Sequence, residues 1–501
     1  MRATSDWLAA GRRFQPNREV LFDAGLGRRW TWEELHDDSL AWMAALAARG
    51  VVAGDRVAVL ALNRGETLAL LFAAAELGAI LVPLSWRLSA PELAWQLDHC
   101  APRVLACDAA SARLARQALG LADCQPVWLD LDAGPGYAPG TPGPGAALDD
   151  PWVLLYTSGS TGRPKGALLT HAQLHWNAVN TALACDLGPS SSTLTPAPLF
   201  HTGGLNCLTT PLLHRGGRVV LTPRLDANEA LRLIATERVT HLMGVPTIYQ
   251  LLADDPAFAT TDLSGVQDAI CGGAPLSPAL LRRFLDRGVP LRQGFGLTEV
   301  GPNCFSMPKD QVRPVMVEGE GAPGCVGKPI HHITTRLMRP DGSDAAVGEA
   351  GELWLRGPVV CAGYWRDPEA TDKAMGDGWF RTGDLLCQDA AGFFHVRGRI
   401  KEMFISGGEN VYPAEVEAAL LALPGVAQAA VVAVPDPRWG EVGRAYVEAA
   451  AGAALDPDAL RVDLGRSLAR FKLPKSIVVL PALPRTGSGK VDKNHLSQLE
   501  S

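Results

Sequence analysis

The stretch Tyr156-Thr-Ser-Gly-Ser-Thr-Gly-Arg-Pro-Lys-Gly166 follows directly on an apolar, strand-like run at residues 152–155. Its glycines let backbone amides turn toward an anion, while its hydroxyls and its lysine add donors and a positive charge. A flexible Ser/Gly linker would explain the glycines but not four hydroxyls and a lysine behind a strand. The pattern therefore predicts a phosphate-binding loop, whose predicted ligand residues are Thr157, Ser158, Gly159, Ser160, Thr161, Gly162 and Lys165.

This loop is not a Walker motif, and neither is the Gly-Lys pair at residues 489–490. Pro484 stands where a Walker motif needs glycine, and Val491 stands where it needs serine or threonine. We therefore expect no P-loop nucleotide-binding domain at this end of the chain.

Outward from the phosphate loop, the first hundred residues alternate helix and strand signals. Thr31 and Glu34 form a capping-box pattern ahead of an apolar-periodic run, and residues 56–60 have the composition of a buried strand. Ser89 and Glu92 open another helix in the same way. This alternation predicts α/β layers with largely parallel sheets.

The pattern changes in the second half of the chain. Beyond Gly342 short strands alternate with turns, and from about Glu402 onward the signals are those of an α+β unit. A chain of 501 residues is too long for one ordinary core. We predict a multi-domain α/β protein with a large N-terminal domain of layered sheets and a small β-rich subdomain at residues 1–400. A small, mobile α+β domain is predicted at residues 401–501.

Composition excludes several classes of protein. The formal net charge is -7 without a long basic run, so nucleic acid is not an expected partner. No apolar stretch approaches the roughly 20 residues that span a bilayer, which predicts a cytoplasmic protein without integral membrane association. The ten cysteines form no close pair, and they are therefore expected to be reduced and mostly buried rather than in disulfides or a zinc site.

Further motifs follow the phosphate loop in a fixed order. They are Gly272-Gly-Ala-Pro275, Gln293-Gly-Phe-Gly-Leu-Thr-Glu299, Gly351-Glu-Leu-Trp-Leu-Arg-Gly357, Gly378-Trp-Phe-Arg-Thr-Gly-Asp384, Gly398-Arg-Ile-Lys-Glu402, Ser406-Gly-Gly-Glu-Asn-Val-Tyr-Pro413 and Pro484-Arg-Thr-Gly-Ser-Gly-Lys490. With these motifs and the phosphate loop, the chain resembles the adenylate-forming superfamily of acyl-CoA synthetases, aryl-CoA ligases, peptide-synthetase adenylation domains and firefly luciferase. The resemblance covers nearly the whole chain.

The resemblance implies an ATP-dependent acyl-CoA ligase. Such an enzyme joins a fatty or aromatic carboxylic acid to AMP with release of pyrophosphate, and then transfers the acyl group to coenzyme A. ATP, Mg²⁺ and coenzyme A are the implied cofactors and co-substrates, a small-molecule acid is the implied partner, and a homodimer is one possible assembly. Residues 405–417 and 435–441 resemble bacterial fatty-acyl and feruloyl-type CoA ligases. Two alternatives stay open: an adenylating enzyme that loads a carrier protein, and a non-catalytic nucleotide-binding relative.

Matched positions carry implied roles at the nucleotide. Glu299 is the implied magnesium ligand, because a hard dication prefers carboxylate and phosphate oxygens, and Thr298 would offer its hydroxyl to the α-phosphate. Asp384 would accept from the ribose hydroxyls, and Arg399 would add charge nearby. The implied adenine site, with Phe295 as its stacking face, consists of Gly273, Ala274, Pro275, Gly294 and Phe295.

Four further implied roles concern catalysis, domain movement, and binding of the acid and of coenzyme A. Lys490 is the implied catalytic residue of the first step, where it would neutralise developing negative charge. Lys401 lies at the implied hinge of the C-terminal domain. His201 is a candidate at the carboxylate of the acid. The implied coenzyme A passage is lined by Ser406, Gly407 and Gly408.

Overall fold

The computed structural model describes residues 6–157, 164–318, 324–406, 409–486 and 489–499. Two groups of predicted site residues lie outside these ranges. The first is residues 158–162 of the phosphate loop, and the second is the pair Gly407 and Gly408 of the predicted coenzyme A passage.

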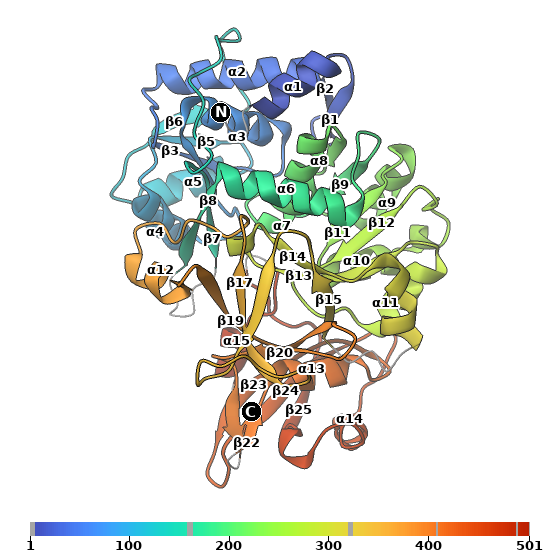
Figure 1. Ribbon diagram of the computed structural model, residues 1–501. Helices are drawn as coiled ribbons and strands as arrows, with labels where there is room; N and C mark the ends of the chain where they lie inside the picture. The colour runs from blue at the N-terminus through green and yellow to red at the C-terminus, as the bar shows by residue number, and fades with distance from the viewer. Residues whose placement is uncertain (1–5, 158–163, 319–323, 407–408, 487–488, 500–501) are drawn as a thin grey trace.

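The first sheet has the strand order β6-β5-β3-β4-β7-β8 and lies near the N-terminus (Figure 1). Its strands are parallel except for β8, which returns antiparallel along β7. This arrangement confirms the predicted α/β layering of this region. The strands are β3 (Arg56–Leu60), β4 (Ile80–Pro83), β5 (Val104–Cys107), β6 (Val127–Asp130), β7 (Pro151–Thr157) and β8 (Lys165–Thr170), and the helices are α1 (Asp6–Phe14), α2 (Trp32–Ala48), α3 (Gly65–Leu77), α4 (Ala90–Cys100) and α5 (Ala112–Leu119).

Both predicted capping boxes are present at helix starts. The Thr31 hydroxyl accepts from the Glu34 amide, and the Glu34 carboxylate accepts from the Thr31 amide, at the start of α2. Ser89 and Glu92 form the equivalent box before α4. Each box satisfies amides that the first helical turn leaves without intrahelical partners, which is why these helices begin at these residues.

The second sheet follows the order β16-β17-β19-β20-β15-β14-β13-β12-β11-β9-β10-β1-β2, with β18 beside β19. From β1 to β13 the central strands are parallel, and from β13 onward the pairs are antiparallel. The β-rich layer expected beyond Gly342 is thus hydrogen-bonded to the parallel strands through β14 and β15. The strands are β1 (Glu19–Asp23), β2 (Arg28–Thr31), β9 (Ser192–Thr195), β10 (Arg218–Leu221), β11 (His241–Gly244), β12 (Asp268–Cys271), β13 (Leu291–Gly296), β14 (Asn303–Ser306), β15 (Cys325–Pro329), β16 (Thr334–Met338), β17 (Ala350–Arg356), β18 (Met375–Gly376), β19 (Trp379–Gln388) and β20 (Phe394–Arg399).

Helices between these strands pack around the second sheet. They are α6 (His171–Cys185), α7 (Thr202–Gly204), α8 (Thr210–Arg215), α9 (Ala227–Thr236), α10 (Pro246–Asp254), α11 (Pro278–Asp286) and α12 (Pro368–Ala374). A short π-helical segment at Leu205–Thr209 joins α7 to α8.

A third sheet, with the path β22-β21-β24-β23 and β25 beside β24, forms the C-terminal end of the molecule (Figure 1). Residues 400–403 connect β20 to its first strand. The predicted domain division at residues 400 and 401 stays a prediction. The elements are β21 (Phe404–Ser406), β22 (Glu409–Val411), β23 (Val426–Asp436), β24 (Gly440–Ala449), β25 (Ser476–Leu480), α13 (Pro413–Leu421), α14 (Pro457–Leu464) and α15 (Lys493–Gln498).

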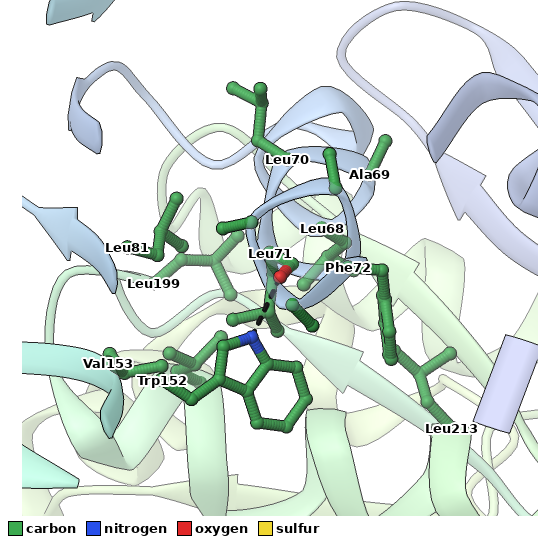
Figure 2. Close-up of a cluster of buried hydrophobic side chains, with 14 of the residues drawn as sticks. Leu68, Ala69, Leu70, Leu71, Phe72, Leu81, Trp152, Val153, Leu199 and Leu213 are labelled. Atoms are coloured by element: carbon green, nitrogen blue, oxygen red, sulfur yellow. Dashed lines mark hydrogen bonds between the residues drawn. The ribbon is translucent and has the colours of Figure 1, made fainter. Parts of the chain in front are cut away.

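A buried apolar cluster holds the strand that leads into the phosphate loop (Figure 2). Trp152 of β7 is fully buried, and its Nε1 donates to the Leu71 carbonyl oxygen of α3 at 2.8 Å. The ring of His171 stacks on Trp152 with a centroid distance of 4.7 Å. Because the indole packs against α3 and is hydrogen-bonded to it, β7 is held against the helix layer.

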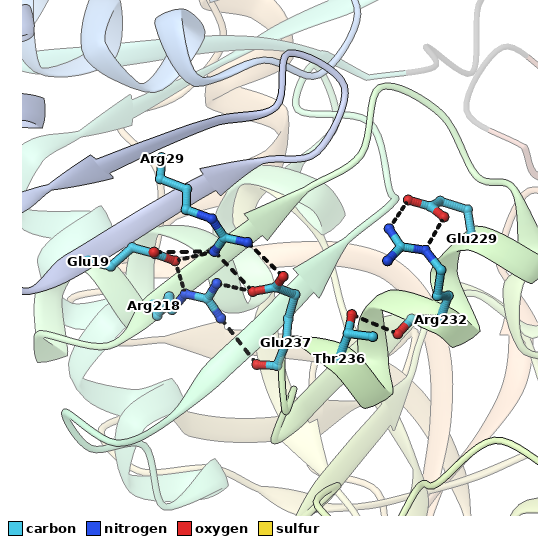
Figure 3. Close-up of polar contacts among 7 residues, drawn as sticks. All are labelled: Glu19, Arg29, Arg218, Glu229, Arg232, Thr236 and Glu237. Atoms are coloured by element: carbon cyan, nitrogen blue, oxygen red, sulfur yellow. Dashed lines mark hydrogen bonds and ion pairs between the residues drawn. The ribbon is translucent and has the colours of Figure 1, made fainter.

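An ion-pair network joins distant parts of the chain at the edge of the second sheet (Figure 3). Arg29 Nη2 of β2 lies 2.8 Å from Glu237 Oε1, and Arg29 Nη1 lies 2.9 Å from Glu19 Oε1 of β1. Arg218 of β10 contacts both glutamates. The network therefore links β1, β2, β10 and the segment after α9.

Two predictions from composition can be compared with the structure. The ten cysteines are free, and all but the half-buried Cys124 are buried, as expected. Among the described residues, no helix has the length and apolar character that crossing a bilayer requires.

Candidate active site

The predicted phosphate loop connects the paired strands β7 and β8. Thr157 ends β7 and pairs with Lys165, which begins β8, and the Thr157 hydroxyl donates to the Lys165 carbonyl oxygen at 3.4 Å. Both predicted residues are therefore at the base of the loop. The remaining loop residues predicted to bind phosphate lie outside the described ranges.

Tyr364 connects the base of the loop to Glu299. The ammonium of Lys165 lies 4.7 Å from the centroid of the Tyr364 ring, and the Tyr364 hydroxyl donates to Glu299 Oε1 at 2.9 Å. Cation–π contact and a charge-assisted hydrogen bond both favour this arrangement. Burial, followed by the charge of Glu299, raises the pKa of the Tyr364 hydroxyl, so it remains a donor.

Glu299 lies in the short 3₁₀ turn Thr298–Val300 that follows β13. Its carbonyl oxygen accepts from the Cys361 amide at 2.8 Å and from Gln173 Nε2 at 3.3 Å. These bonds come from α6 and from the segment after β17, so the backbone is held on two sides while the half-buried carboxylate faces Tyr364. Thr298 beside it is buried.

The predicted adenine wall follows β12. Gly273 has φ +80°, a conformation that favours glycine, and a Cβ there would lie 3.4 Å from Val245 Cγ1. Gln293 holds this loop, because its Oε1 accepts from the Leu276 amide at 2.9 Å and its Nε2 donates to the Ala274 carbonyl oxygen at 3.2 Å. The loop is therefore tied to the start of the Gln293–Glu299 motif.

The other predicted adenine residues lie on β13. Gly294 is buried, and Phe295 is half-buried with its ring edge-to-face against Phe305 at a centroid distance of 5.9 Å. A ring supported in this way keeps its orientation when a flat ligand stacks on it.

Asp384 and Arg399 face each other on the paired strands β19 and β20. Arg399 Nε lies 2.8 Å from Asp384 Oδ1. Within the described residues, the buried second oxygen, Oδ2, accepts no hydrogen bond. Burial raises the pKa of Asp384 to about 6, and Arg399 limits that rise. A buried carboxylate oxygen of this kind suits a ligand hydroxyl as its donor.

Lys490 comes from the C-terminal part of the chain to the same place. Its side chain keeps contact with solvent, yet burial by the surrounding protein is the main cause that lowers the pKa of its ammonium, and the charge of Arg399 adds to it. The charges of three carboxylates, those of Asp384, Glu299 and Glu402, instead raise the pKa of Lys490. The folded chain thus gathers one lysine, one arginine and the predicted nucleotide carboxylates.

His201 lies at the start of α7 as its N-cap. Its Nδ1 accepts from the Gly203 amide at 3.0 Å, which places the proton of the neutral ring on Nε2. Burial first, and then the charges of Lys490 and Arg87, lower the pKa of His201 to about 4. The imidazole is therefore neutral at physiological pH and presents Nε2–H as a donor.

The remaining predicted residues lie where β20 leads into the third sheet. Lys401 is exposed in the turn after β20, and Ser406 is buried at the end of β21. Of the three residues predicted to line the coenzyme A passage, the structure describes Ser406 but neither Gly407 nor Gly408.

Comparisons with known proteins identify the family of this chain. Residues 9–365 match the model of the AMP-binding enzyme family, and residues 415–490 match that of the AMP-binding enzyme C-terminal domain. The chain is 41% identical over 499 residues to a feruloyl-CoA synthase of an Amycolatopsis species, covering 98% of this chain and 97% of the relative. It belongs to the AMP-binding enzyme family.

Two further similarities extend this assignment. An indoleacetate–CoA ligase of Aromatoleum aromaticum is 41% identical over 469 residues, which cover 91% of this chain and 90% of the relative. The solved structure of o-succinylbenzoate CoA synthetase from Bacillus subtilis, in complex with an acyl-adenylate intermediate, has a TM-score of 0.88 and 29% identity, covering 100% and 99% of the two chains. This AMP-binding enzyme is an AMP-forming acid–thiol ligase that uses ATP and coenzyme A.

The donor set of this AMP-binding enzyme fits magnesium bound together with ATP. Among the residues that the structure describes, no group of three or more His, Cys, Asp and Glu side chains could hold a metal ion. Magnesium does not need such a group, because it binds through one or two carboxylates together with substrate phosphates. Glu299, oriented by Tyr364, offers one carboxylate.

Sequence reasoning missed two residues of the candidate site. Tyr364 lies outside all of the recognised motifs, and no residue near it in sequence predicts a contact with Glu299. Gln293 was inside a recognised motif without an assigned role, although a polar side chain at the start of a glycine-rich motif was a usable signal.

Proposed function

We propose that the acid activated by this ligase is an aryl-substituted carboxylic acid of the hydroxycinnamic or indolylacetic class. The two relatives at 41% identity, named for ferulate and indoleacetate, support this proposal because they match nearly the whole chain. The resemblance also implies that Val300 to Cys304 contribute to one wall of the acid pocket, and this segment contains the polar residue Asn303. Asn303 Nδ2 donates to Thr181 Oγ1 at 2.8 Å and to the Cys207 carbonyl oxygen at 3.2 Å. A wall that contains a polar side chain suits a substituted ring better than an alkyl chain.

The reaction proceeds in two balanced steps. First, a carboxylate oxygen of the acid attacks the α-phosphorus of ATP, the bond from that phosphorus to the bridging oxygen breaks, and pyrophosphate leaves without a proton transfer. Then the thiol of coenzyme A attacks the acyl carbonyl, loses its proton and displaces AMP. In the first step two anionic partners meet, so the main task of the protein is to supply positive charge.

Lys490 supplies that charge in our assignment. The observation that supports it is that the charges of Arg399, Asp384 and Glu299, in the second sheet and its turn, act on the pKa of Lys490 near the end of the chain. Asp384 Oδ2 would accept from the ribose, and Glu299 with Thr298 would hold Mg²⁺ and the α-phosphate. Bound Mg²⁺ would neutralise part of the phosphate charge.

His201 would orient the acid. As a neutral ring with its proton on Nε2, it can donate to one carboxylate oxygen without removing the negative charge that the attack requires. A protonated ring would pair with the carboxylate and weaken it as a nucleophile.

The C-terminal part, residues 401–501, would turn about Lys401 between the two steps and bring Ser406 and its glycine neighbours to the acyl group. Lys401 is exposed between two sheets, where a backbone change disturbs little packing. Thioester formation would then follow without dissociation of the adenylate.

Mass spectrometry of the products tests the acid class. The enzyme is incubated with ATP, Mg²⁺, coenzyme A and one acid from a panel of ferulate, 4-coumarate, indoleacetate, octanoate and palmitate. We expect AMP and acyl-CoA with the aryl acids, at a kcat/KM at least tenfold above that of either fatty acid, since pocket shape discriminates by such factors. Preference for a fatty acid would contradict the acid class. Adenylate without thioester would contradict coenzyme A as the acceptor.

A further inference from the structure

The turn that carries Lys490, defined here as residues 484–486 and 489–492 and called the Lys490 turn, is held by its own backbone. Arg485 and Val491 form an isolated antiparallel bridge, and the Thr486 amide donates to the Lys490 carbonyl oxygen at 2.8 Å. The Asp492 amide donates to the Pro484 carbonyl oxygen at 2.8 Å. Backbone hydrogen bonds therefore hold the described residues of this turn together.

Arg485 connects the Lys490 turn to the rest of the protein. Arg485 Nη1 donates to the Gly489 carbonyl oxygen at 3.1 Å and to Thr247 Oγ1 at 2.9 Å. Gly489 directly precedes Lys490, whereas Thr247 lies in the first turn of α10, far away in sequence. One guanidinium nitrogen thus joins the residue before Lys490 to the large N-terminal part of the chain.

Thr247 is itself close to the candidate adenine wall. It follows Val245, whose Cγ1 would lie 3.4 Å from a Cβ at Gly273, and α10 begins directly after Val245 at Pro246. The contact between Arg485 and Thr247 therefore relates the Lys490 turn to the segment that packs on the adenine wall. A shift of α10 would be transmitted to Lys490 through this hydrogen bond.

We propose that Arg485 is a positioning residue for Lys490, which acts by fixing the Lys490 turn against α10 through Thr247 Oγ1. The proposal rests on the proposed role of Lys490 in adenylate formation. Arg485 is exposed, so its bond to Thr247 contributes little to folding. Its effect falls on geometry, and a displacement of about 1 Å at a reacting group costs up to roughly 100-fold in rate.

Thr247→Val is the cleanest test, because valine has the shape of threonine without the hydroxyl and leaves the bond from Arg485 to Gly489 in place. We expect the kcat for adenylate formation, measured as pyrophosphate release without coenzyme A, to fall about tenfold. The KM for ATP should stay within about twofold, since no group that touches ATP is removed. Thr247→Ser keeps the hydroxyl and should restore most of the rate.

The double variant Arg485→Met with Thr247→Val tests whether the two residues act through one bond. Its rate should be no lower than that of Arg485→Met, because the second change removes nothing that the first left intact. Thioester formation from supplied acyl-adenylate should stay within about twofold in all these variants. Arg466→Met, which removes another exposed arginine from the C-terminal part, is the matched control and should behave as wild type.

The inference would be overturned if the fold-losses in adenylation rate of the two single variants multiplied in the double variant. It would also be overturned if Thr247→Val formed adenylate at the wild-type rate. Equal loss of both half-reactions would also overturn it, because that pattern indicates general disruption of the fold. Lys490→Ala distinguishes failure of this inference from failure of the proposed function. Normal adenylation by Lys490→Ala would contradict the role of Lys490 itself. Lost adenylation in Lys490→Ala, together with normal adenylation in Thr247→Val, would contradict only the role of Arg485.

Discussion

Arg399 Nε lies 2.8 Å from Asp384 Oδ1 across the paired strands β19 and β20, and Asp384 Oδ2 stays buried and without a hydrogen-bond donor among the described residues. One arginine thus engages one oxygen of the carboxylate and leaves the other for a ligand. Because the second oxygen can accept from a ligand only while the carboxylate is ionised, we expect the use of ATP to depend on pH.

We expect the kcat/KM for ATP to fall as the pH drops below about 6. Burial raises the pKa of Asp384 to about 6, so the carboxylate is ionised above that pH and can accept from ribose hydroxyls, whereas below it the added proton removes an acceptor. A pH–rate profile should show a decrease approaching tenfold per pH unit on the acid side. Asp384→Asn should be slow throughout and should lack this decrease. An unchanged acid limb in that variant would assign it to another group.

Lys490→Ala should separate the two half-reactions. Loss of a donor at the developing charge should lower the rate of adenylate formation by about 100-fold to 1000-fold. Thioester formation from supplied acyl-adenylate should change by less than about fivefold, because that step needs no new charge at the α-phosphate. Lys373→Ala, at an exposed lysine, serves as the control. Equal loss in both steps would contradict the role.

Tyr364→Phe should raise the Mg²⁺ concentration needed for half-maximal adenylation by about three- to tenfold. The change removes the hydroxyl that donates to Glu299 Oε1, so the carboxylate is no longer oriented. Titration of Mg²⁺ at saturating ATP measures the effect, and saturating Mg²⁺ should restore most of the rate. Tyr137→Phe, at an exposed tyrosine, should leave the titration unchanged. A rate loss that Mg²⁺ does not reverse would place Tyr364 in another role.

Glu237→Gln should lower the free energy of unfolding by about 1 to 3 kcal/mol at neutral pH, because hydrogen bonds to charged groups contribute in this range. The hydrogen bond from Arg29, together with Arg218, lowers the pKa of Glu237 to about 2 from its ordinary 4.5. The stabilisation is therefore fully present above pH 4.5 and is lost as the pH falls from 4.5 to 2.

Thermal or urea unfolding at several pH values checks this expectation. The difference between wild type and Glu237→Gln should shrink on the acid side. Glu229→Gln, which breaks an exposed i,i+3 pair with Arg232, should cost less than about 0.5 kcal/mol. A difference for Glu237→Gln that does not change with pH would show that packing rather than charge is responsible.

Much of the local structure could be predicted from residues a few positions apart. Thr31 with Glu34 gives a helix start because a side chain can reach an amide three residues away, and the buried strand at residues 56–60 follows from the unbroken apolar side chains of residues 57–60. Joining of the β-rich layer to the parallel strands could not be predicted, because it depends on the pairing of β15 with β20, which are distant in sequence.

The sequence by itself determined the family and the order of its motifs, together with the glycine, hydroxyl and lysine composition of the phosphate loop. These features depend on residue type and short spacing, which folding does not alter. Only the tertiary structure decided that Asp384 pairs with Arg399, that Tyr364 donates to Glu299, and that Arg485 reaches Thr247. The first contact requires the register of β19 against β20, and the other two require packing between segments distant in sequence. Register and packing are set by burial of the whole core rather than by neighbouring residues.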